Sequence, residues 1–371
     1  MRIRGAVLEE IGRPRPYAES QPMTVSDLDL APPRDSELLV RVQAAGVCHS
    51  DLSVVDGNRV RPVPMLLGHE ASGVVEAVGA DVSDIGPGQR VIMTFLPRCG
   101  DCAPCQTGGR VPCVAGSTSN NAGELLAGGG RLSRAGEEIK HHLGVSGFAT
   151  HCVVDRRSVV PVDDDVPPEV AAVLGCAVLT GGGALINAAR PESGQTVAVV
   201  GLGGVGMAAL ITAVGLEGCT VIGVDGLRDK LDTATRLGAD QVFTPAEFAE
   251  AGTRADVVIE AAGSARAFEA AVAATAPGGV TVTVGLPSPE ARSSISPLGL
   301  VAEGRTIIGS YLGSAVPERD IPVFIDLWRR GRLPVQELIS SVIGLEDLNS
   351  AMDALADGKA VRQVMLFPAD G

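Results

Sequence analysis

The sequence has little positive charge for its length, and nowhere does positive charge gather. Its 371 residues include 30 Lys and Arg against 44 Asp and Glu, a formal net charge of −14. Nucleic-acid binding needs clustered Lys and Arg opposite the phosphate backbone, so we expect no nucleic-acid partner. The excess of acidic residues favours solubility.

The sequence also lacks repeats, low-complexity tracts and, at its N-terminus, an apolar segment with a cleavage site. We therefore expect a cytoplasmic protein without a membrane partner. The long uncharged stretch 194–216 is interrupted by glycines, and we interpret it as a buried strand, a turn and a buried helix. The length predicts two domains.

Eight cysteines are few for a disulfide-stabilised chain of this length, and they are unevenly distributed. Four of them share the short run CGDCAPCQTGGRVPC, with C-x2-C-x2-C-x7-C spacing: Cys99, Cys102, Cys105 and Cys113. Thiols in a reducing compartment bind metal or do chemistry rather than form disulfides. Four thiolates at this spacing match the tetrahedral shell of a structural zinc.

A second set of metal-ligating residues is spread along the first half of the chain: Cys48 in GVCHSD, His69 in GHE and Cys176 in LGCAVLTGG. Each alone would be an ordinary core or structural residue. Together, two thiolates and an imidazole are the ligand set of a catalytic zinc that keeps one position open. Three further histidines, His141, His142 and His151, are expected to be solvated or structural.

The pattern of elements changes near residue 178. Before it, short apolar runs separated by Gly, Pro and Asp turns predict a β-rich region, with a loop-like segment over 114–147. After it, strand-like and helix-like runs alternate, which predicts an α/β fold with a doubly wound parallel sheet. Helices over 321–333 and 345–358 and a strand over 362–367 are expected to return to the first domain.

The run Gly201-Leu-Gly-Gly-Val-Gly206 fits the G-x-G-x-x-G pattern between a predicted strand and a predicted helix. Gly201 would allow the tight turn, Gly203 the approach of a pyrophosphate, and Gly206 close helix–strand packing. Asp225 ends the next predicted strand, where a carboxylate would bind the adenosine ribose and repel a 2′-phosphate. This favours NAD over NADP.

With these motifs in their observed order, the chain resembles the zinc-containing medium-chain alcohol dehydrogenases over essentially its full length. Further matching motifs are the GxVxxVG after GHE, GCAVLTG, and the terminal VRQVMLF. The extended loop after Cys113 resembles the dimeric animal-type and class III branch. The resemblance implies a GroES-like catalytic domain over 1–177 and 312–371, with a zinc lobe at 95–115, and a Rossmann NAD-binding domain over 178–311.

The resemblance also implies roles for individual residues. Cys48, His69 and Cys176 would bind the catalytic zinc, so that each chain holds two Zn2+ ions and one NAD. Near this zinc it implies a carboxylate at Glu70, a partner for His69 at Asp51, a proton acceptor at Ser50 and a pocket wall at Phe95. For the cofactor it implies contacts from His49, Thr180, Gly201, Gly203, Gly204, Val205, Gly206, Asp225, Lys230 and Arg362.

The implied function is reversible hydride transfer between NAD and a small alcohol, aldehyde or ketone. Many relatives have a histidine that passes the proton to solvent where this chain has Ser53, so either Ser53 and water complete the relay or the outlet differs. A glutathione-type substrate is not supported, because Arg131 and Arg134 are only remote candidates for its carboxylate.

Three alternatives stay open. A polyol dehydrogenase or a carbonyl reductase would keep the same fold, and a non-catalytic protein that binds NAD and zinc would keep the same ligands. A homodimer through the uncharged strand near 305–313 is expected from the resemblance.

Overall fold

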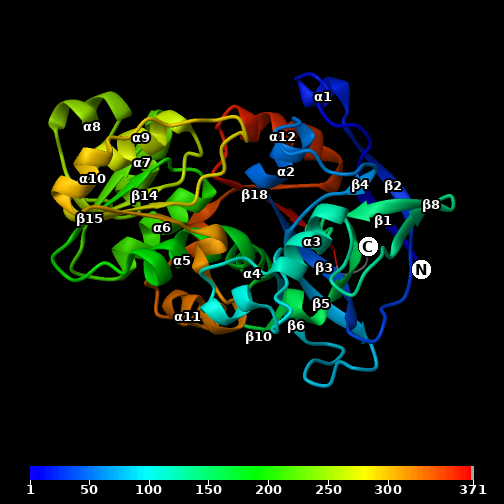
Figure 1. The fold of residues 1–371 in the computed structure, drawn as a ribbon. Coiled ribbons are helices and arrows are strands. Elements are labelled where there is room, and N and C mark those ends of the chain that lie inside the picture. Colours follow the sequence, from blue (N-terminus) through cyan, green and yellow to red (C-terminus); the bar gives the residue numbers. More distant parts are fainter. Residues whose placement is uncertain (369–371) are drawn as a thin grey trace. The chain divides into compact units, whose positions relative to one another are not determined.

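The structure is a computed structural model that describes residues 1–368 (Figure 1). The chain forms two compact units, one of Met1–Cys176 with the segment that begins at Ile339, the other of Ala177–Leu338. The first boundary lies close to the predicted one at 177. The second differs from the prediction at 311, because residues after 311 pack within the second unit.

The first unit contains a closed barrel and a seven-stranded sheet. The barrel runs in the order β1 (Arg2–Leu8), β2 (Met23–Leu30), β7 (Leu132–Arg134), β8 (Glu137–His141) and β4 (Met65–Leu66). The sheet runs β10 (Val159–Val162), β6 (Arg90–Met93), β5 (Glu70–Val78), β3 (Glu37–Val47), β18 (Arg362–Leu366), β17 (Ile339–Ile343), with β9 (His151–Asp155) also paired to β3. The helices of this unit are α1 (Tyr17–Ser20), α2 (His49–Val55), α3 (Val114–Ala122), α4 (Pro168–Val173) and α12 (Leu348–Ala356).

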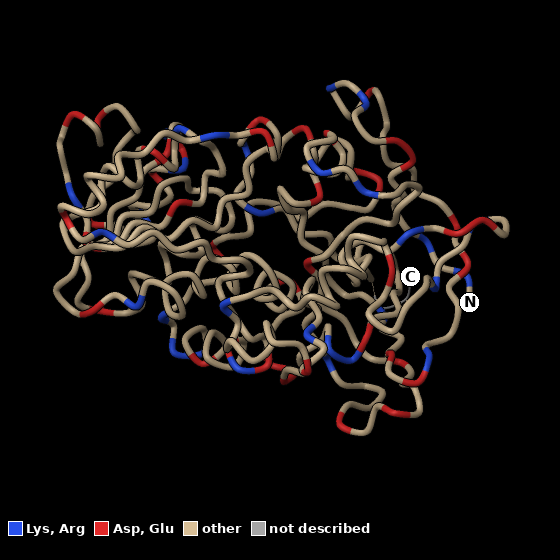
Figure 2. Tube along the Cα trace, viewed as in Figure 1, with Lys and Arg blue, Asp and Glu red and all other residues tan. Residues whose placement is uncertain are grey.

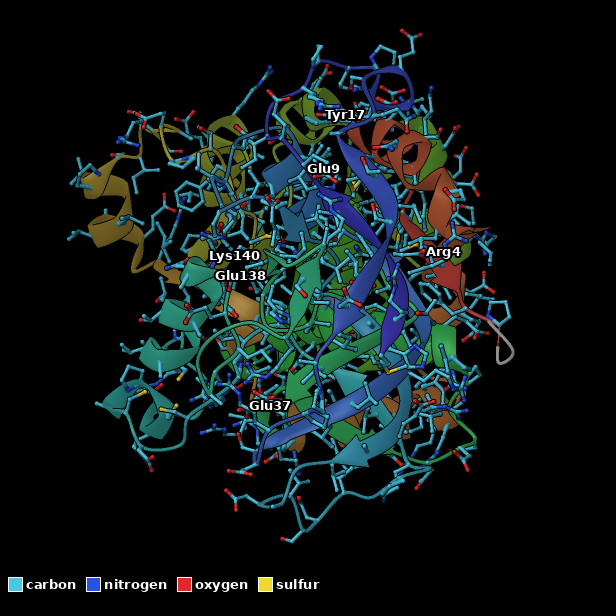
Figure 3. All side chains as sticks on the ribbon, turned by 90° about the vertical axis from the view of Figure 1, so that its right-hand side faces the viewer. Arg4, Glu9, Tyr17, Glu37, Glu138 and Lys140 are labelled. Carbon is cyan, nitrogen blue, oxygen red and sulfur yellow. The ribbon has the colours of Figure 1, made fainter. Side chains whose placement is uncertain are left out.

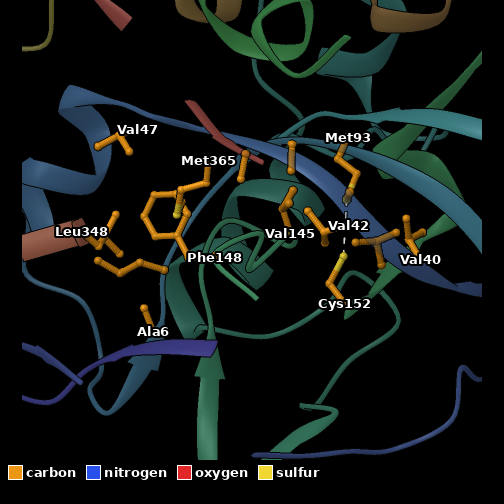
Figure 4. Close-up of a cluster of buried hydrophobic side chains, with 14 of the residues drawn as sticks. Ala6, Val40, Val42, Val47, Met93, Val145, Phe148, Cys152, Leu348 and Met365 are labelled. Atoms are coloured by element: carbon orange, nitrogen blue, oxygen red, sulfur yellow. Dashed lines mark hydrogen bonds between the residues drawn. The ribbon is translucent and has the colours of Figure 1, made fainter. Parts of the chain in front are cut away.

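Strand β3 is the centre of this unit. It pairs with β5, β9 and β18, and its inward side chains, including Val40 and Val42, are buried. Figure 4 shows these valines beside Met93 and Cys152, whose sulfurs lie 3.4 Å apart. The apolar core therefore continues up to Val47, the last residue of β3, where the first candidate metal ligand follows.

The start of β3 is fixed by a buried ion pair. Glu37, labelled in Figure 3, accepts a hydrogen bond of 2.8 Å from Arg131 Nε, and both side chains are buried. Elsewhere charges of both signs are interspersed along the trace of each unit (Figure 2), and many are paired, as Arg15 is with Asp353 and Asp357.

The second unit has a six-stranded, all-parallel sheet. Its order is β13 (Gln241–Phe243), β12 (Thr220–Val224), β11 (Thr196–Val200), β14 (Ala255–Glu260), β15 (Thr275–Thr283), β16 (Thr306–Gly309). The helices are α5 (Leu179–Gly183), α6 (Gly204–Gly215), α7 (Arg228–Arg236), α8 (Pro245–Ala251), α9 (Ala265–Ala274), α10 (Pro297–Glu303) and α11 (Pro317–Arg329). The apolar run of β11 is buried, as expected of an inner parallel strand. The predicted α/β class with a doubly wound parallel sheet is confirmed.

Three segments differ from the expectations. Residues 114–147 hold α3, β7 and β8 rather than a loop. Helix α11 starts at Pro317 and belongs to the second unit, because Phe324 packs on Gly182 and Asp320 accepts a hydrogen bond of 3.0 Å from Asn187. The helical run Pro168–Ala189 is apolar and long enough to cross a membrane, but 89% of its most apolar window is buried within the protein.

Candidate active site

Three elements of the first unit bring Cys48, His69 and Cys176 together. Cys48 precedes α2, His69 lies between β4 and β5, and Cys176 lies in a π-helical turn, Leu174–Val178. All three are buried, their donor atoms lie within 4.8 Å of one another, and Cys176 Sγ is 3.4 Å from His69 Nε2. We call these three residues the metal trio.

The chemistry of the metal trio fits a zinc ion. A hydrogen bond from Cys176 lowers the pKa of Cys48 well below its usual value, so one sulfur is readily a thiolate. Burial alone lowers the pKa of His69, but the charge of Asp51 and its hydrogen bond outweigh burial and raise it. A raised pKa means that His69 readily holds a proton on each ring nitrogen, and a bound metal would displace the one on Nε2. Two sulfurs with one imidazole suit Zn2+.

Asp51 orients His69 from behind. Its Oδ1 accepts hydrogen bonds from His69 Nδ1 at 3.0 Å and Gly68 N at 3.2 Å, and its Oδ2 accepts one from Cys48 N at 3.1 Å. Burial raises the pKa of Asp51, but the charge of His69, the nearby His142 ring and the hydrogen bond from His69 give a net lowering. A charged Asp51 holds the proton of His69 on Nδ1, which leaves Nε2 free to ligate a metal.

Glu70 lies beside the metal trio and is fully buried. Its Oε1 is 3.4 Å from Arg362 Nε, yet neither carboxylate oxygen has a hydrogen bond among the described residues. Burial raises the pKa of Glu70 to about 7. A Cβ on Gly46 would lie 2.3 Å from Glu70 Oε1, so a larger residue at position 46 would push the carboxylate from its place. Two buried carboxylate oxygens that lack hydrogen bonds and lie next to two sulfurs are further evidence that a cation fits here.

Arg362 was expected at the cofactor phosphates. Its side chain is buried, pairs with Glu70 and donates a hydrogen bond of 3.0 Å to the carbonyl of Val47. A phosphate contact remains a prediction.

The other predicted residues of this region surround the metal trio. The Phe95 ring meets the His69 ring edge-on, with centroids 5.5 Å apart at 89°. Ser50 is half-buried on the first turn of α2, and His49 is exposed beside it. Ser53 donates a hydrogen bond of 2.7 Å to the carbonyl of His49, so its hydroxyl proton is already used within the helix.

The four-cysteine run forms a compact lobe, as its spacing predicted. The four sulfurs lie within 4.8 Å of one another, and all eight cysteines of the described chain are free thiols. Backbone hydrogen bonds, first from Val114, lower the pKa of Cys102 to about 6. Burial raises the pKa of Cys105 to about 12, so a bound cation would be needed to hold that sulfur as a thiolate. Four sulfurs that converge in this way match a closed structural zinc shell.

The glycine pattern forms the turn between β11 and α6. Gly201 has φ +90°, and a Cβ there would lie 2.6 Å from Ala262 N. A Cβ on Gly206 would lie 1.7 Å from the carbonyl oxygen of Gly201, so α6 packs directly on the turn. A Cβ on Gly203 would meet nothing within 4 Å, and Gly204 begins the helix. This leaves the helix N-terminus open to an anionic group.

Asp225 stands at the carboxyl end of β12. Its oxygens accept hydrogen bonds from Leu202 N at 2.7 Å and Leu227 N at 2.9 Å, and Lys230 Nζ lies 4.0 Å away. Gly201 and Asp225 both line a cavity of about 870 Å³ that extends between α8 and α9. Open parallel sheets bind ligands at the carboxyl ends of their strands.

Thr180 and Val205 come together where α5 crosses α6. Thr180 is buried, and a Cβ on the next residue, Gly181, would lie 2.1 Å from the carbonyl oxygen of Val205. The two predicted cofactor contacts therefore lie near each other in the second unit.

One residue of the site was missed by the sequence analysis. His142 was expected to be solvated or structural, but its Nδ1 lies 3.2 Å from Asp51 Oδ1. The adjacent pair His141–His142 was the only signal in the sequence, and two neighbouring histidines do not say which of them faces a carboxylate.

Known proteins share the fold of this chain. Models of the alcohol dehydrogenase GroES-like domain and of the zinc-binding dehydrogenases match residues 34–164 and 204–329. An alcohol dehydrogenase zinc-binding domain protein from Burkholderia ambifaria is 30% identical, with a TM-score of 0.90 and 99% of each chain covered. Benzyl alcohol dehydrogenase from Acinetobacter calcoaceticus is 29% identical, with a TM-score of 0.90, over 99% of this chain and 100% of that chain. A thermostable alcohol dehydrogenase from Pyrobaculum aerophilum is 25% identical, with a TM-score of 0.81, over 99% and 100%.

A GroES-like barrel unit with two thiol-rich sites and a Rossmann-type sheet with a dinucleotide turn define a zinc-containing dehydrogenase that uses NAD or NADP. The chain belongs to the zinc-dependent medium-chain alcohol dehydrogenase family. The predicted family is confirmed.

Proposed function

We propose that this protein is an NAD-dependent zinc alcohol dehydrogenase of the dimeric animal-type or class III branch, which oxidises a primary or secondary alcohol reversibly. The observation that carries the proposal is the buried metal trio, in which three donors rather than four converge. Three protein donors leave one position of a tetrahedral zinc for substrate, whereas the four-sulfur lobe leaves none.

Bound zinc would supply Lewis acidity that makes an alcohol more acidic and polarises a carbonyl, and bound NAD would accept the hydride. The chain itself would position these groups. Asp51 keeps the Nδ1 proton on His69, Phe95 forms a wall next to His69, and Ser50 Oγ takes the proton of the substrate hydroxyl. Since Ser53 already donates to His49, we propose that water carries the proton onward.

The position of Asp225 supports NAD over NADP. Both of its oxygens are held at the rim of the cavity by backbone N–H groups, so its negative charge stays where the adenosine ribose would bind. The nearby Arg228 is paired with Glu247 and would have to leave that partner to bind a 2′-phosphate. We expect kcat/KM to be higher with NAD than with NADP. The substitution Asp225→Ser should reduce the ratio of kcat/KM with NAD to kcat/KM with NADP. An unchanged ratio would contradict the assignment.

The substrate class is proposed as small alcohols, with benzyl alcohol among the first to test because of the likeness to an Acinetobacter benzyl alcohol dehydrogenase. A polyol dehydrogenase or a carbonyl reductase is the alternative on the same fold. A panel of primary, secondary and polyhydric alcohols, with aldehydes and ketones in reverse, followed by NADH absorbance separates them.

We propose a cytoplasmic homodimer that pairs through β16. This edge strand is uncharged, and the neighbouring helix α10 exposes Leu298 and Val301 at 76% and 82%. Such an edge needs covering. Light scattering of the purified protein should give the mass of two chains, and Val301→Glu should reduce it.

The decisive experiment uses purified holoenzyme. It should contain two zinc ions per chain and reduce NAD with at least one alcohol. Cys48→Ala and His69→Ala should abolish turnover while NAD still binds. Wild-type rates in either variant would refute the proposal, and no turnover with any substrate by a protein that binds both zinc and NAD would favour a non-catalytic role.

A further inference from the structure

His142 is buried in the turn that leads from β8 to β9. Its backbone N–H donates a hydrogen bond of 2.9 Å to Ser146 Oγ, and its carbonyl accepts hydrogen bonds from Val145 N and Ser146 N at 3.0 and 3.2 Å. Ser146 adopts φ +57°, a left-handed conformation that closes the turn. The backbone of His142 is therefore fixed on both sides, and its ring has little freedom to move.

This ring points to the carboxylate behind the metal trio. His142 Nδ1 lies 3.2 Å from Asp51 Oδ1, the same oxygen that accepts the hydrogen bond from His69 Nδ1 at 3.0 Å. His142 Nδ1 itself makes no hydrogen bond among the described residues, so its contact with Asp51 is one of charge. All three side chains are buried, with exposed fractions of 0% or 1%. Two imidazoles from distant parts of the chain thus converge on one oxygen that water cannot reach.

His142 also touches His69 directly. Their rings meet edge-on, with centroids 5.5 Å apart at 86°, and Phe95 makes a second edge-on contact at the same distance. The His69 ring is therefore held at Nδ1 by Asp51 and along its plane by two perpendicular rings. Edge-to-face pairs of this kind add stabilisation beyond that of the buried area.

We propose that His142 is a positioning residue of the catalytic metal site: it fixes the Asp51 carboxylate and the plane of His69, so that Nε2 faces Cys48 and Cys176. The inference deepens the proposed function, since it assumes that the metal trio binds zinc. Outer-shell partners of metal-binding histidines affect metal affinity by about 10- to 100-fold, and His142 acts on such a partner through a second contact.

The test compares two amide substitutions, Asn and Gln, whose difference of one methylene group changes where the N–H group lies. In His142→Asn, the side-chain amide lies near the former Nδ1 position and can still reach Asp51. In His142→Gln, the amide lies further out, beyond that position. His141→Gln is the matched control, because His141 is equally buried but contacts Arg131 N and Ser146 rather than Asp51.

The main readout is zinc release from the holoenzyme to a colorimetric chelator, measured as separate phases for the trio and the lobe. Cys48→Ala identifies the trio phase. We expect His142→Gln to release the trio zinc about 10- to 100-fold faster than wild type, with the lobe phase unchanged, and His142→Asn and His141→Gln to stay near wild type. Cobalt in the trio should show a changed visible spectrum in His142→Gln alone.

Equal release rates for His142→Asn, His142→Gln and wild type would overturn the inference while leaving the proposed function intact. Faster release from both sites, or an equal effect of His141→Gln, would assign His142 to general stability and also overturn it. If the protein binds zinc only in the lobe, then the proposed function fails, and this inference fails with it. Each readout concerns the metal rather than turnover, so the two failures are distinguishable.

Discussion

His141 allows a pH dependence of stability to be worked out from the structure. The residue ends β8 with a 1% exposed side chain, and its Nε2 accepts a hydrogen bond of 3.0 Å from Arg131 N–H. Burial first, and then the charges of Arg131 and Lys140, lower the pKa of His141 to about 3. The folded protein therefore keeps this histidine neutral over the whole ordinary pH range.

The unfolded chain behaves differently, because an ordinary histidine has a pKa of about 6.5. Below that pH, His141 binds a proton in the unfolded state but stays neutral in the folded state. The contribution to stability is complete above about pH 7 and is lost as the pH falls, by about 1.4 kcal/mol per unit, until the folded pKa is reached. At about pH 5 this residue alone should have cost about 2 kcal/mol of unfolding free energy.

His141→Gln tests this value, because glutamine offers an oxygen near the position of Nε2 and does not titrate. Hydrogen–deuterium exchange of peptides from the first unit gives the opening free energy of wild type and variant at about pH 7.5 and 5. As the pH falls from about 7.5 to 5, we expect the opening free energy of the variant to rise by about 2 kcal/mol relative to that of wild type. Acid effects on the zinc sites are common to both proteins and cancel. A difference that does not change with pH would refute the reasoning.

Three further outcomes are expected. Arg131→Met leaves the buried Glu37 carboxylate without its cation and should cost about 3–5 kcal/mol in thermal unfolding, whereas adding Glu37→Leu should recover much of it; a double variant no better than the single one would contradict this. Gly206→Ala forces α6 away from the Gly201 carbonyl and should weaken NAD binding by on the order of tenfold or more in calorimetry, so an unchanged Kd would count against the placement of the cofactor. Cys105→Ser should lower bound zinc from two ions to one per chain and reduce thermal stability while NAD binding persists; retention of both ions would contradict the lobe assignment.

The cofactor turn could be predicted from sequence because its determinants are local. Gly201 needs a positive φ, and Gly206 needs to be without a Cβ where α6 meets the turn. Both requirements fall within the same six residues, so a strand–turn–helix pattern in the sequence is enough to predict them. The parallel sheet followed for the same reason, from short apolar runs that alternate with helical ones.

Helix α3 could not be predicted this way, because its residues VAGSTSNNA show no apolar stripe. Its start depends on Cys113, whose sulfur accepts a hydrogen bond of 3.4 Å from Gly116 N in the position of an N-cap. A cysteine is not a usual capping residue, so the signal is invisible until the lobe is folded. Helix α11 was assigned to the wrong part of the chain for a similar reason, since its place depends on the packing of Phe324 against Gly182.

The candidate site shows the same limit within two adjacent residues. His141 and His142 carry the same side chain and are equally buried, yet their rings serve different partners. At the end of β8 successive side chains point to opposite faces, so His141 meets Arg131 N while His142 reaches Asp51. Sequence can name the types of residue that a zinc site needs, because ligand chemistry restricts them. Which of the two histidines faces Asp51 depends on the face to which each side chain points. That face is set only when the chain has folded.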